Sequence, residues 1–190
     1  LEYYPLVGAD KASEEAMRPL LSLFKQAYRE DFHLSEFDWL LERIEADEAQ
    51  AGLVLEQIDR RINAVETSSL GRVFDAVTAL LGLGHYNHFD AQLPMLLESV
   101  IDESVDEHFA FDLIREGNSP VKISLCQAIR QLVTETRQGT SAAVLSARFH
   151  NTLAEALLEM AAVARKVTGL ETVALSGGAF CNRYLINRLV

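Results

Sequence analysis

The apolar residues near the start of the chain recur every three or four positions, which is the spacing of one helix face. Residues 1–12 are interrupted by proline and glycine and are expected to be extended or looped. A second helix is predicted after an N-cap at Ser35, and a third from about residue 49, with Ile62 and Val65 still on its apolar face. The first apolar stripe consists of Met17, Leu20, Leu21, Phe24 and Tyr28.

A strongly apolar segment follows, and its pattern predicts a helix over residues 70–83 that is capped by Ser68 or Ser69. Glycines at the end of this segment are typical of a helix C-terminus. Residues 85–93 have no regular period and are expected to form a loop, after which a further helix is predicted over residues 94–100. The chain is therefore expected to remain helical on both sides of an irregular loop.

Turn residues separate two short segments in the second half of the chain. Residues 108–114 and 120–123 predict strands, and Gly117-Asn118 between them predicts the turn of a small hairpin. Two helices follow, of which the second is expected to run from about residue 141 to residue 167 and to end at a glycine. The predicted fold class is mainly α with a few short strands.

The C-terminal segment combines a short apolar run with a glycine turn. Residues 172–175 predict a buried strand, which is followed by a turn at residues 176–178 and by a new helix near Ala179. Free backbone N–H groups at such a helix start can hold a phosphate, and Asn182 on the first turn could reach the same ligand. From these residues alone, a tight strand-to-helix connection is favoured over a nucleotide site, because short glycine turns are common.

Arg72 and Asp75 are three positions apart on the predicted helix over residues 70–83 and share one face of it. The favoured local interpretation is a surface salt bridge on a capped helix. The alternative is functional, with Arg72 contacting an anionic group while Asp75 orients its guanidinium. Both interpretations stay open at this point.

Histidines do not predict a metal site in this chain. His150 stands alone on its helix, without a second histidine or a glutamate at the spacing of metal ligands, and a structural role is favoured. His85, His88 and Asp90 form a weak triplet, for which a solvated polar loop is the favoured interpretation.

The formal net charge of −11 disfavours nucleic acid as a partner, although it leaves a nucleotide pocket possible. No apolar run is long enough for a membrane span, so no membrane partner is predicted. Cys126 and Cys181 are expected to be buried thiols in a reducing, cytoplasmic compartment. The chain begins without methionine, which predicts an excised piece of a longer protein.

Three motifs occur in the same order as in one known family. Residues 67–83, 146–154 and 173–185 resemble segments of the carbamoyltransferase domain of HypF, a family of hydrogenase maturation proteins, and residues 1–10 are similar to the start of the same stretch. The resemblance covers nearly the whole chain. It implies that residues 1–190 are part of a carbamoyltransferase domain truncated at both ends, and that they are a fragment of an α/β actin-like ATPase fold.

The resemblance also implies a reaction. A carbamoyl-adenylate, made from carbamoyl phosphate and ATP in a neighbouring domain, passes its carbamoyl group to the C-terminal cysteine of the partner HypE, towards the cyanide ligand of nickel–iron hydrogenase. The implied partners are a HypE-type acceptor and upstream domains of the parent protein. A divalent metal is implied in the parent through residues outside this chain, and the isolated chain is expected to be inactive.

Site residues follow from the same resemblance. The positions implied for nucleotide binding are Ser176, Gly177, Gly178 and Asn182. The positions implied for support of the cleft are Ser68, Ser69, Gly71 and His150. The catalytic candidates are Asp75, Arg72 and Asp90.

The chain differs from the usual family sequence at three positions. Ala9 and Ala91 stand where the family usually has glycine, and Asp90 stands where it usually has glutamate. Alanine lacks the backbone freedom of glycine, so activity is expected to suffer if the loop at residues 89–92 carries chemistry. The alternatives are a related O-carbamoyltransferase, a tRNA-modifying or sugar-kinase-like enzyme, and a non-catalytic helical scaffold.

Overall fold

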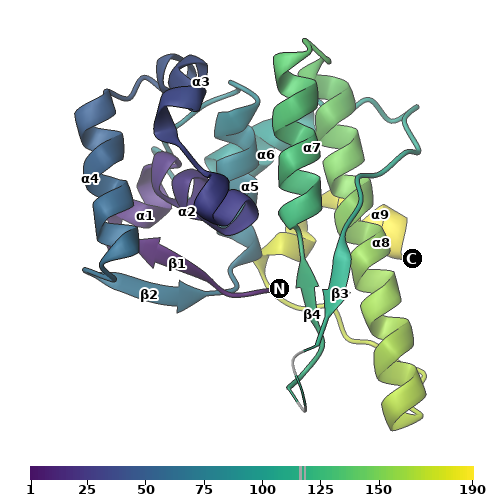
Figure 1. Cartoon of the computed structure of the whole chain (residues 1–190). Helices are drawn as coiled ribbons and strands as arrows, with labels where there is room; N and C mark the ends of the chain where they lie inside the picture. Colours follow the sequence, from purple (N-terminus) through teal and green to yellow (C-terminus); the bar gives the residue numbers. More distant parts are fainter. Residues whose placement is uncertain (116, 118) are drawn as a thin grey trace.

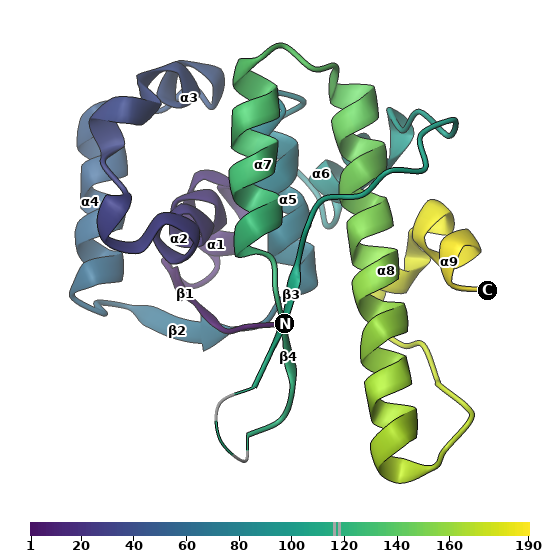
Figure 2. The same cartoon turned by 45° about the vertical axis from the view of Figure 1, so that its right-hand side comes forward.

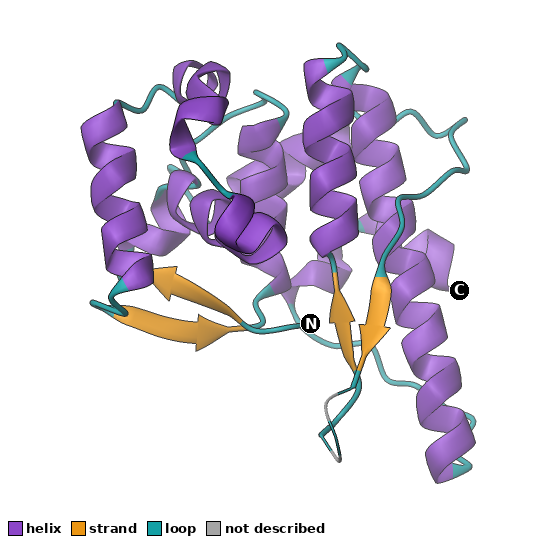
Figure 3. Ribbon diagram, in the orientation of Figure 1, coloured by secondary structure: helices purple, strands orange, loops and turns teal. Residues whose placement is uncertain are grey.

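The fold is mainly helical and is built around helix α2, which packs against helices α4, α5 and α7 (Figures 1 and 3). The computed structural model describes residues 1–115, 117 and 119–190. Their helices are α1 (Lys11–Glu14), α2 (Met17–Tyr28), α3 (Asp38–Arg43), α4 (Glu48–Asp59), α5 (Leu70–Leu80), α6 (Gln92–Ser99), α7 (Cys126–Arg137), α8 (Ala142–Thr168) and α9 (Arg183–Leu189). Short 3-10 helices, η1 (Arg29–Asp31), η2 (Leu34–Phe37) and η3 (Gly178–Cys181), link several of them.

The core confirms the predicted apolar stripe of α2. Leu20, Leu21 and Phe24 are fully buried, while Met17 and Tyr28 pack against the core from its edge. The Phe24 ring contacts Phe37 with a centroid separation of 5.1 Å, so this stripe anchors the segment that leads into α3. Burial of this face, rather than helix propensity, holds α2 in place.

Two predictions for the first part of the chain are wrong. Ser35 lies inside η2 and does not cap a helix, because α3 begins only at Asp38. The helix that starts near residue 49 ends at Asp59, and Ile62 and Val65, which are 51% and 62% exposed, do not continue its apolar face.

The segment after α4 forms a strand instead. β2 (Ala64–Thr67) pairs antiparallel with β1 (Tyr4–Val7), in register Tyr4 with Thr67. Arg61 and Asn63 have positive φ angles of 56° and 50°, and they reverse the chain between α4 and β2. Helical periodicity could not reveal this pairing, because the partner strand lies at the other end of the N-terminal region.

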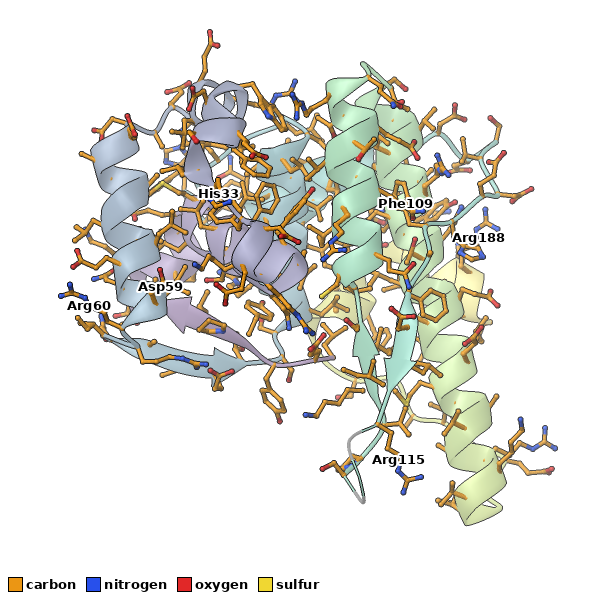
Figure 4. The ribbon with its side chains drawn as sticks, in the orientation of Figure 1. His33, Asp59, Arg60, Phe109, Arg115 and Arg188 are labelled. Carbon is orange, nitrogen blue, oxygen red and sulfur yellow. The ribbon has the colours of Figure 1, made fainter. Side chains whose placement is uncertain are left out.

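The predicted hairpin is confirmed in shortened form. β3 (Asp112–Ile114) pairs antiparallel with β4 (Lys122–Ser124). Gly117 has a φ of 56°, as the turn requires, whereas Asn118 of the predicted turn lies outside the described residues. Phe109 precedes the strand, and its backbone N–H donates to Thr152 Oγ1 at 2.9 Å, which fixes it beside α8 (Figure 4).

The last long helix has the predicted ends. The Ser141 side chain accepts a hydrogen bond from the Val144 N–H at the start of α8, and Gly169 closes the helix with a φ of 72°. The second half of α8 extends away from the other helices, and the following segment turns back beside it (Figure 2). We name residues 157–177 the projecting segment.

The predicted buried strand at residues 172–175 is wrong for this structure. These residues form no strand and are exposed, with Val173 at 62%. A strand needs a neighbouring backbone to pair its N–H and C=O groups, and the described residues supply none there. The helix expected near Ala179 is divided into the short η3 and α9.

The two cysteines are less buried than expected. Cys126 is half-buried, but Cys181 is exposed rather than buried. Within the described ranges, every helix is too short or too polar to cross a lipid bilayer.

Candidate functional site

A cavity of about 480 Å³ lies between the start of α5, the loop before α6, and the η3–α9 segment. It brings together six of the predicted site residues from segments far apart in the sequence: Ser69, Gly71, Arg72, Asp90, Gly178 and Asn182. Apolar and acidic side chains complete its lining, namely Phe74, Ala91, Pro94, Met95, Glu98, Ala179 and Cys181. The predicted meeting of the two motifs in one cleft is therefore seen in the structure.

Five predicted site residues do not line this cavity. Ser176 and Gly177 are exposed before η3, and Ser68 precedes the helix cap. Asp75 and His150 are buried behind the lining, with exposed fractions of 1% and 0%. These last two can act on the cavity only through the residues they contact.

The start of α5 is fixed by a set of local hydrogen bonds. Ser69 is the N-cap, and its Oγ accepts from the Arg72 N–H at 3.4 Å. The Tyr4 hydroxyl donates to the Ser69 carbonyl at 2.8 Å, and Thr67 Oγ1 accepts from the Ser69 N–H at 3.1 Å. Strand β1 thereby holds the first turn of α5 against the cavity.

The ion pair of Arg72 and Asp75 is buried, so the favoured surface salt bridge is wrong. Arg72 Nε lies 3.0 Å from Asp75 Oδ2, and the two side chains are 14% and 1% exposed. Burial raises the pKa of Asp75 to about 6, against the opposing effects of Arg72 and of a hydrogen bond from Asn87. Spacing could predict the shared helix face but not that other elements cover it.

Asn87 is a polar residue of this site that the sequence did not single out. Its Nδ2 donates to Asp75 Oδ1 at 3.1 Å and to the Ser13 carbonyl at 2.9 Å, while its Oδ1 accepts from the Leu93 N–H at 2.9 Å. Its backbone N–H donates to the Glu14 carbonyl at 2.8 Å. Asn87 therefore joins α1, α5 and α6 and holds the loop that forms one edge of the cavity.

That loop carries an alanine in a conformation that favours glycine. Ala91 has a φ of 61°, and Ala9 near the start of the chain has a φ of 50°. The family that the sequence resembles usually has glycine at both positions, and glycine adopts such φ angles more readily than alanine. Asp90 lies beside Ala91 in the lining and further raises the pKa of Asp75.

The opposite side of the cavity is the start of α9. Asn182 is its N-cap rather than a residue of its first turn, and its Oδ1 accepts from the Leu185 N–H at 2.8 Å. Glu98 on α6, also missed by the sequence, accepts from the Arg183 and Tyr184 N–H groups at 2.7 and 3.1 Å. An isolated glutamate near the end of a helix gave no signal that it would cap another helix.

His150 supports this side of the cavity from behind. Asn182 Nδ2 lies 2.9 Å from His150 Nε2, and His150 Nδ1 lies 2.8 Å from the Ser146 carbonyl. Burial lowers the pKa of His150 to about 4, so the ring is neutral near pH 7. Cleft support, the role that the family resemblance implied for His150, stays a prediction.

The lining combines apolar side chains, two carboxylates and one cation. Phe74, Pro94 and Met95 provide an apolar wall, and the carboxylates of Asp90 and Glu98 can accept from hydroxyl groups. Arg72 brings positive charge, and its Nη1 is buried without a hydrogen-bond partner among the described residues. The described residues contain no cluster of three or more His, Cys, Asp or Glu side chains that could hold a metal ion.

Comparison with known proteins agrees with the order of the motifs. A family model described as carbamoyltransferase, Kae1-like domain, second subdomain, matches residues 1–190. The chain is 27% identical to carbamoyltransferase HypF of Synechocystis sp., over 98% of the chain and 25% of that protein. It is 30% identical to a HypF homolog of Cupriavidus necator, over 97% of the chain and 47% of that protein.

A solved structure has the same fold. The chain superposes on full-length HypF in its phosphate- and nucleotide-bound form with a TM-score of 0.88 and 34% identity, covering 100% of the chain and 24% of that protein. This likeness confirms the predicted relation to an actin-like transferase fold. The chain spans about a quarter to about half of the length of these relatives.

Proposed function

The chain belongs to the HypF family of carbamoyltransferases, and from this premise we propose that its cavity is one wall of a cleft that binds carbamoyl-adenylate. The observation that carries the proposal is the meeting of Arg72, at the start of α5, with Asn182, at the start of α9, across one cavity. The phosphate- and nucleotide-bound form of the related HypF supports a nucleotide as the ligand.

The lining suits the parts of this ligand. A purine base would lie on the apolar side chains of Phe74 and Met95, and ribose hydroxyls would donate to the carboxylate of Asp90 or Glu98. The Arg72 guanidinium, which lines the cavity, would attract the phosphate by its positive charge.

The proposed reaction is acyl transfer to a thiolate. The sulfur of the acceptor attacks the carbamoyl carbon, a C–S bond forms, the bond from that carbon to the phosphate oxygen breaks, and AMP leaves with the electron pair. Negative charge therefore grows on the phosphate. Arg72 stabilises this charge, while Asp75 and Asn87 keep its guanidinium in place.

The wider setting belongs to the same proposal. The acceptor is the C-terminal cysteine of a HypE-type partner in nickel–iron hydrogenase maturation, and the reaction takes place in the cytoplasm. Other domains of the parent protein form the carbamoyl-adenylate from ATP and carbamoyl phosphate, and residues there bind the divalent metal. This chain contributes nucleotide contacts and would be inactive alone.

The test uses the chain in a protein that has the remaining HypF segments, mixed with ATP, carbamoyl phosphate and the HypE-type partner. Mass spectrometry of the partner's C-terminal peptide should show a carbamoyl adduct on the terminal cysteine. Arg72→Gln and Asn182→Ala should each lower its rate of formation by about 10²-fold, as loss of a charge-stabilising or orienting group does. Arg165→Gln, an exposed arginine on α8, is the matched control and should leave the rate unchanged.

A non-catalytic scaffold is the second candidate, and the loop before α6 favours it. Asp90 is shorter than the usual glutamate, and Ala91 takes a left-handed backbone conformation that is unfavourable for alanine. A scaffold predicts that the folded protein forms no adduct and binds no AMP, and that Asn182→Ala changes only stability. Adduct formation by the unaltered protein would exclude this candidate.

A further inference from the structure

We propose that His150 is a positioning residue that fixes the orientation of the Asn182 side-chain amide at the cavity wall. The inference deepens the proposed function, on which it rests for the identity of the ligand. His150 itself has no contact with the cavity, because it is fully buried between α5, α8 and α9. Its action on a ligand must therefore pass through Asn182, which does line the cavity.

Hydrogen bonding determines which nitrogen of His150 carries the proton. The Ser146 carbonyl, 2.8 Å from Nδ1, can only accept, so Nδ1 is the donor. The neutral ring then has an unprotonated Nε2, which can only accept. Asn182 must direct its NH₂ group, and not its oxygen, towards this nitrogen at 2.9 Å.

A second contact fixes the other end of the amide. Asn182 Oδ1 accepts from the Leu185 N–H at 2.8 Å, as the N-cap of α9. Rotation of the amide by half a turn would place oxygen against the lone pair of His150 Nε2 and NH₂ against the Leu185 N–H. Both contacts would become repulsive, so a single orientation of the amide is stable.

The fixed amide keeps groups free for a ligand. One Nδ2 hydrogen is used by His150 and one oxygen lone pair by Leu185, which leaves one donor and one acceptor site on Asn182. His150 in turn is fixed by Ser146, whose Oγ donates to the Leu97 carbonyl of α6 at 2.6 Å. A continuous set of hydrogen bonds thus joins α6, α8 and α9 behind the cavity.

Simple packing is the competing role. The His150 ring contacts Phe74 and Tyr184, with centroid separations of 5.3 and 5.7 Å, and an apolar side chain could fill the same space. Packing requires volume alone, whereas positioning requires an acceptor facing Asn182. Two substitutions separate these roles: His150→Leu keeps apolar volume, and His150→Gln keeps a carbonyl acceptor.

The first experiment measures AMP affinity by titration calorimetry, with the chain in a protein that has the remaining HypF segments. His150→Leu should weaken binding about tenfold, the effect of one lost orienting hydrogen bond, and His150→Gln should restore most of the loss. On an Asn182→Ala background, His150→Leu should change affinity less than twofold, because the residue it positions is gone. An equal tenfold loss on both backgrounds, or no rescue by glutamine, would overturn the proposal.

A second measurement does not depend on any ligand. Nitrogen-15 NMR of the ring should show His150 protonated at Nδ1. The Asn182 Nδ2 proton that faces His150 should have a downfield chemical shift that is lost in His150→Leu and regained in His150→Gln. Protonation at Nε2, or unchanged Asn182 signals in the leucine variant, would refute the positioning role. If the NMR results agree but the unaltered protein with the remaining HypF segments binds no AMP, the proposed function fails while the positioning of Asn182 stands.

Discussion

The cavity walls and the projecting segment, residues 157–177, differ in how far their side chains contact the rest of the chain. Behind the cavity, buried polar groups such as Asp75, Asn87 and His150 are hydrogen-bonded between elements far apart in sequence. In the projecting segment, apolar side chains such as Val167 and Leu170 are 76% and 69% exposed. The first region depends on specific partners within the chain, and the second has few contacts to lose. Substitutions should therefore have large effects in one and small effects in the other.

Removal of Asn87 should have the largest effect on stability. Asn87→Ala leaves Asp75 Oδ1 and the Leu93 N–H buried without partners, so the free energy of unfolding should fall by about 3 kcal/mol. Urea denaturation followed by circular dichroism would measure this loss. Asn187→Ala, at an exposed position of α9, is the matched control and should change the value by less than about 0.5 kcal/mol. Similar losses for both variants would contradict the contrast between the regions.

The next largest effect is on the pH dependence of stability. Two buried groups contribute to it with opposite signs. The pKa of Asp75 is raised from 3.8 to about 6, so the native state holds an extra proton and this contribution to stability is lost as pH rises between those values. The pKa of His150 is lowered from 6.5 to about 4, so its contribution is gained over nearly the same interval. In the unaltered chain the two contributions largely cancel.

Single substitutions should expose each contribution. Relative to the unaltered chain, Asp75→Asn should gain about 3 kcal/mol of unfolding free energy as pH rises from 4 to 6.5, and His150→Gln should lose a similar amount. Denaturation at several pH values would measure both slopes. Parallel curves for all three proteins would mean that neither buried group titrates as its surroundings require.

The sequence predicted these regions unequally, for physical reasons. Periodicity identified α2 and α8, and local chemistry limited the cap of α5 to Ser68 or Ser69, because these features depend on near neighbours. The burial of Asp75 and the hydrogen bonds of Asn87 depend on elements that pack over these residues. A local sequence pattern cannot predict such packing. The meeting of Arg72 with Asn182 was predicted only by the ordered family motifs, since spacing cannot show contact across such a separation.

A smaller gain in stability is expected at the loop before α6. Ala91→Gly should raise the free energy of unfolding by about 0.5–1 kcal/mol, because glycine accepts the φ of 61° without strain. Thermal denaturation would detect a shift of a few degrees. Ala162→Gly, at an exposed position inside α8, is the matched change and should instead destabilise the chain by about 1 kcal/mol. Destabilisation by both would show that Ala91 is not strained in solution.

Substitutions in the projecting segment should have the smallest effect on stability but the largest effect on self-association. Its exposed apolar side chains are Leu158, Val167, Leu170, Val173 and Leu175. Val173→Asp should change the free energy of unfolding by less than about 0.5 kcal/mol, because the side chain is already 62% exposed, yet it should lower self-association of the chain in sedimentation experiments. Val65→Asp, at an equally exposed valine on β2, should leave association unchanged, because it lies outside the projecting segment. Equal effects of the two aspartates would attribute association to net charge rather than to this segment.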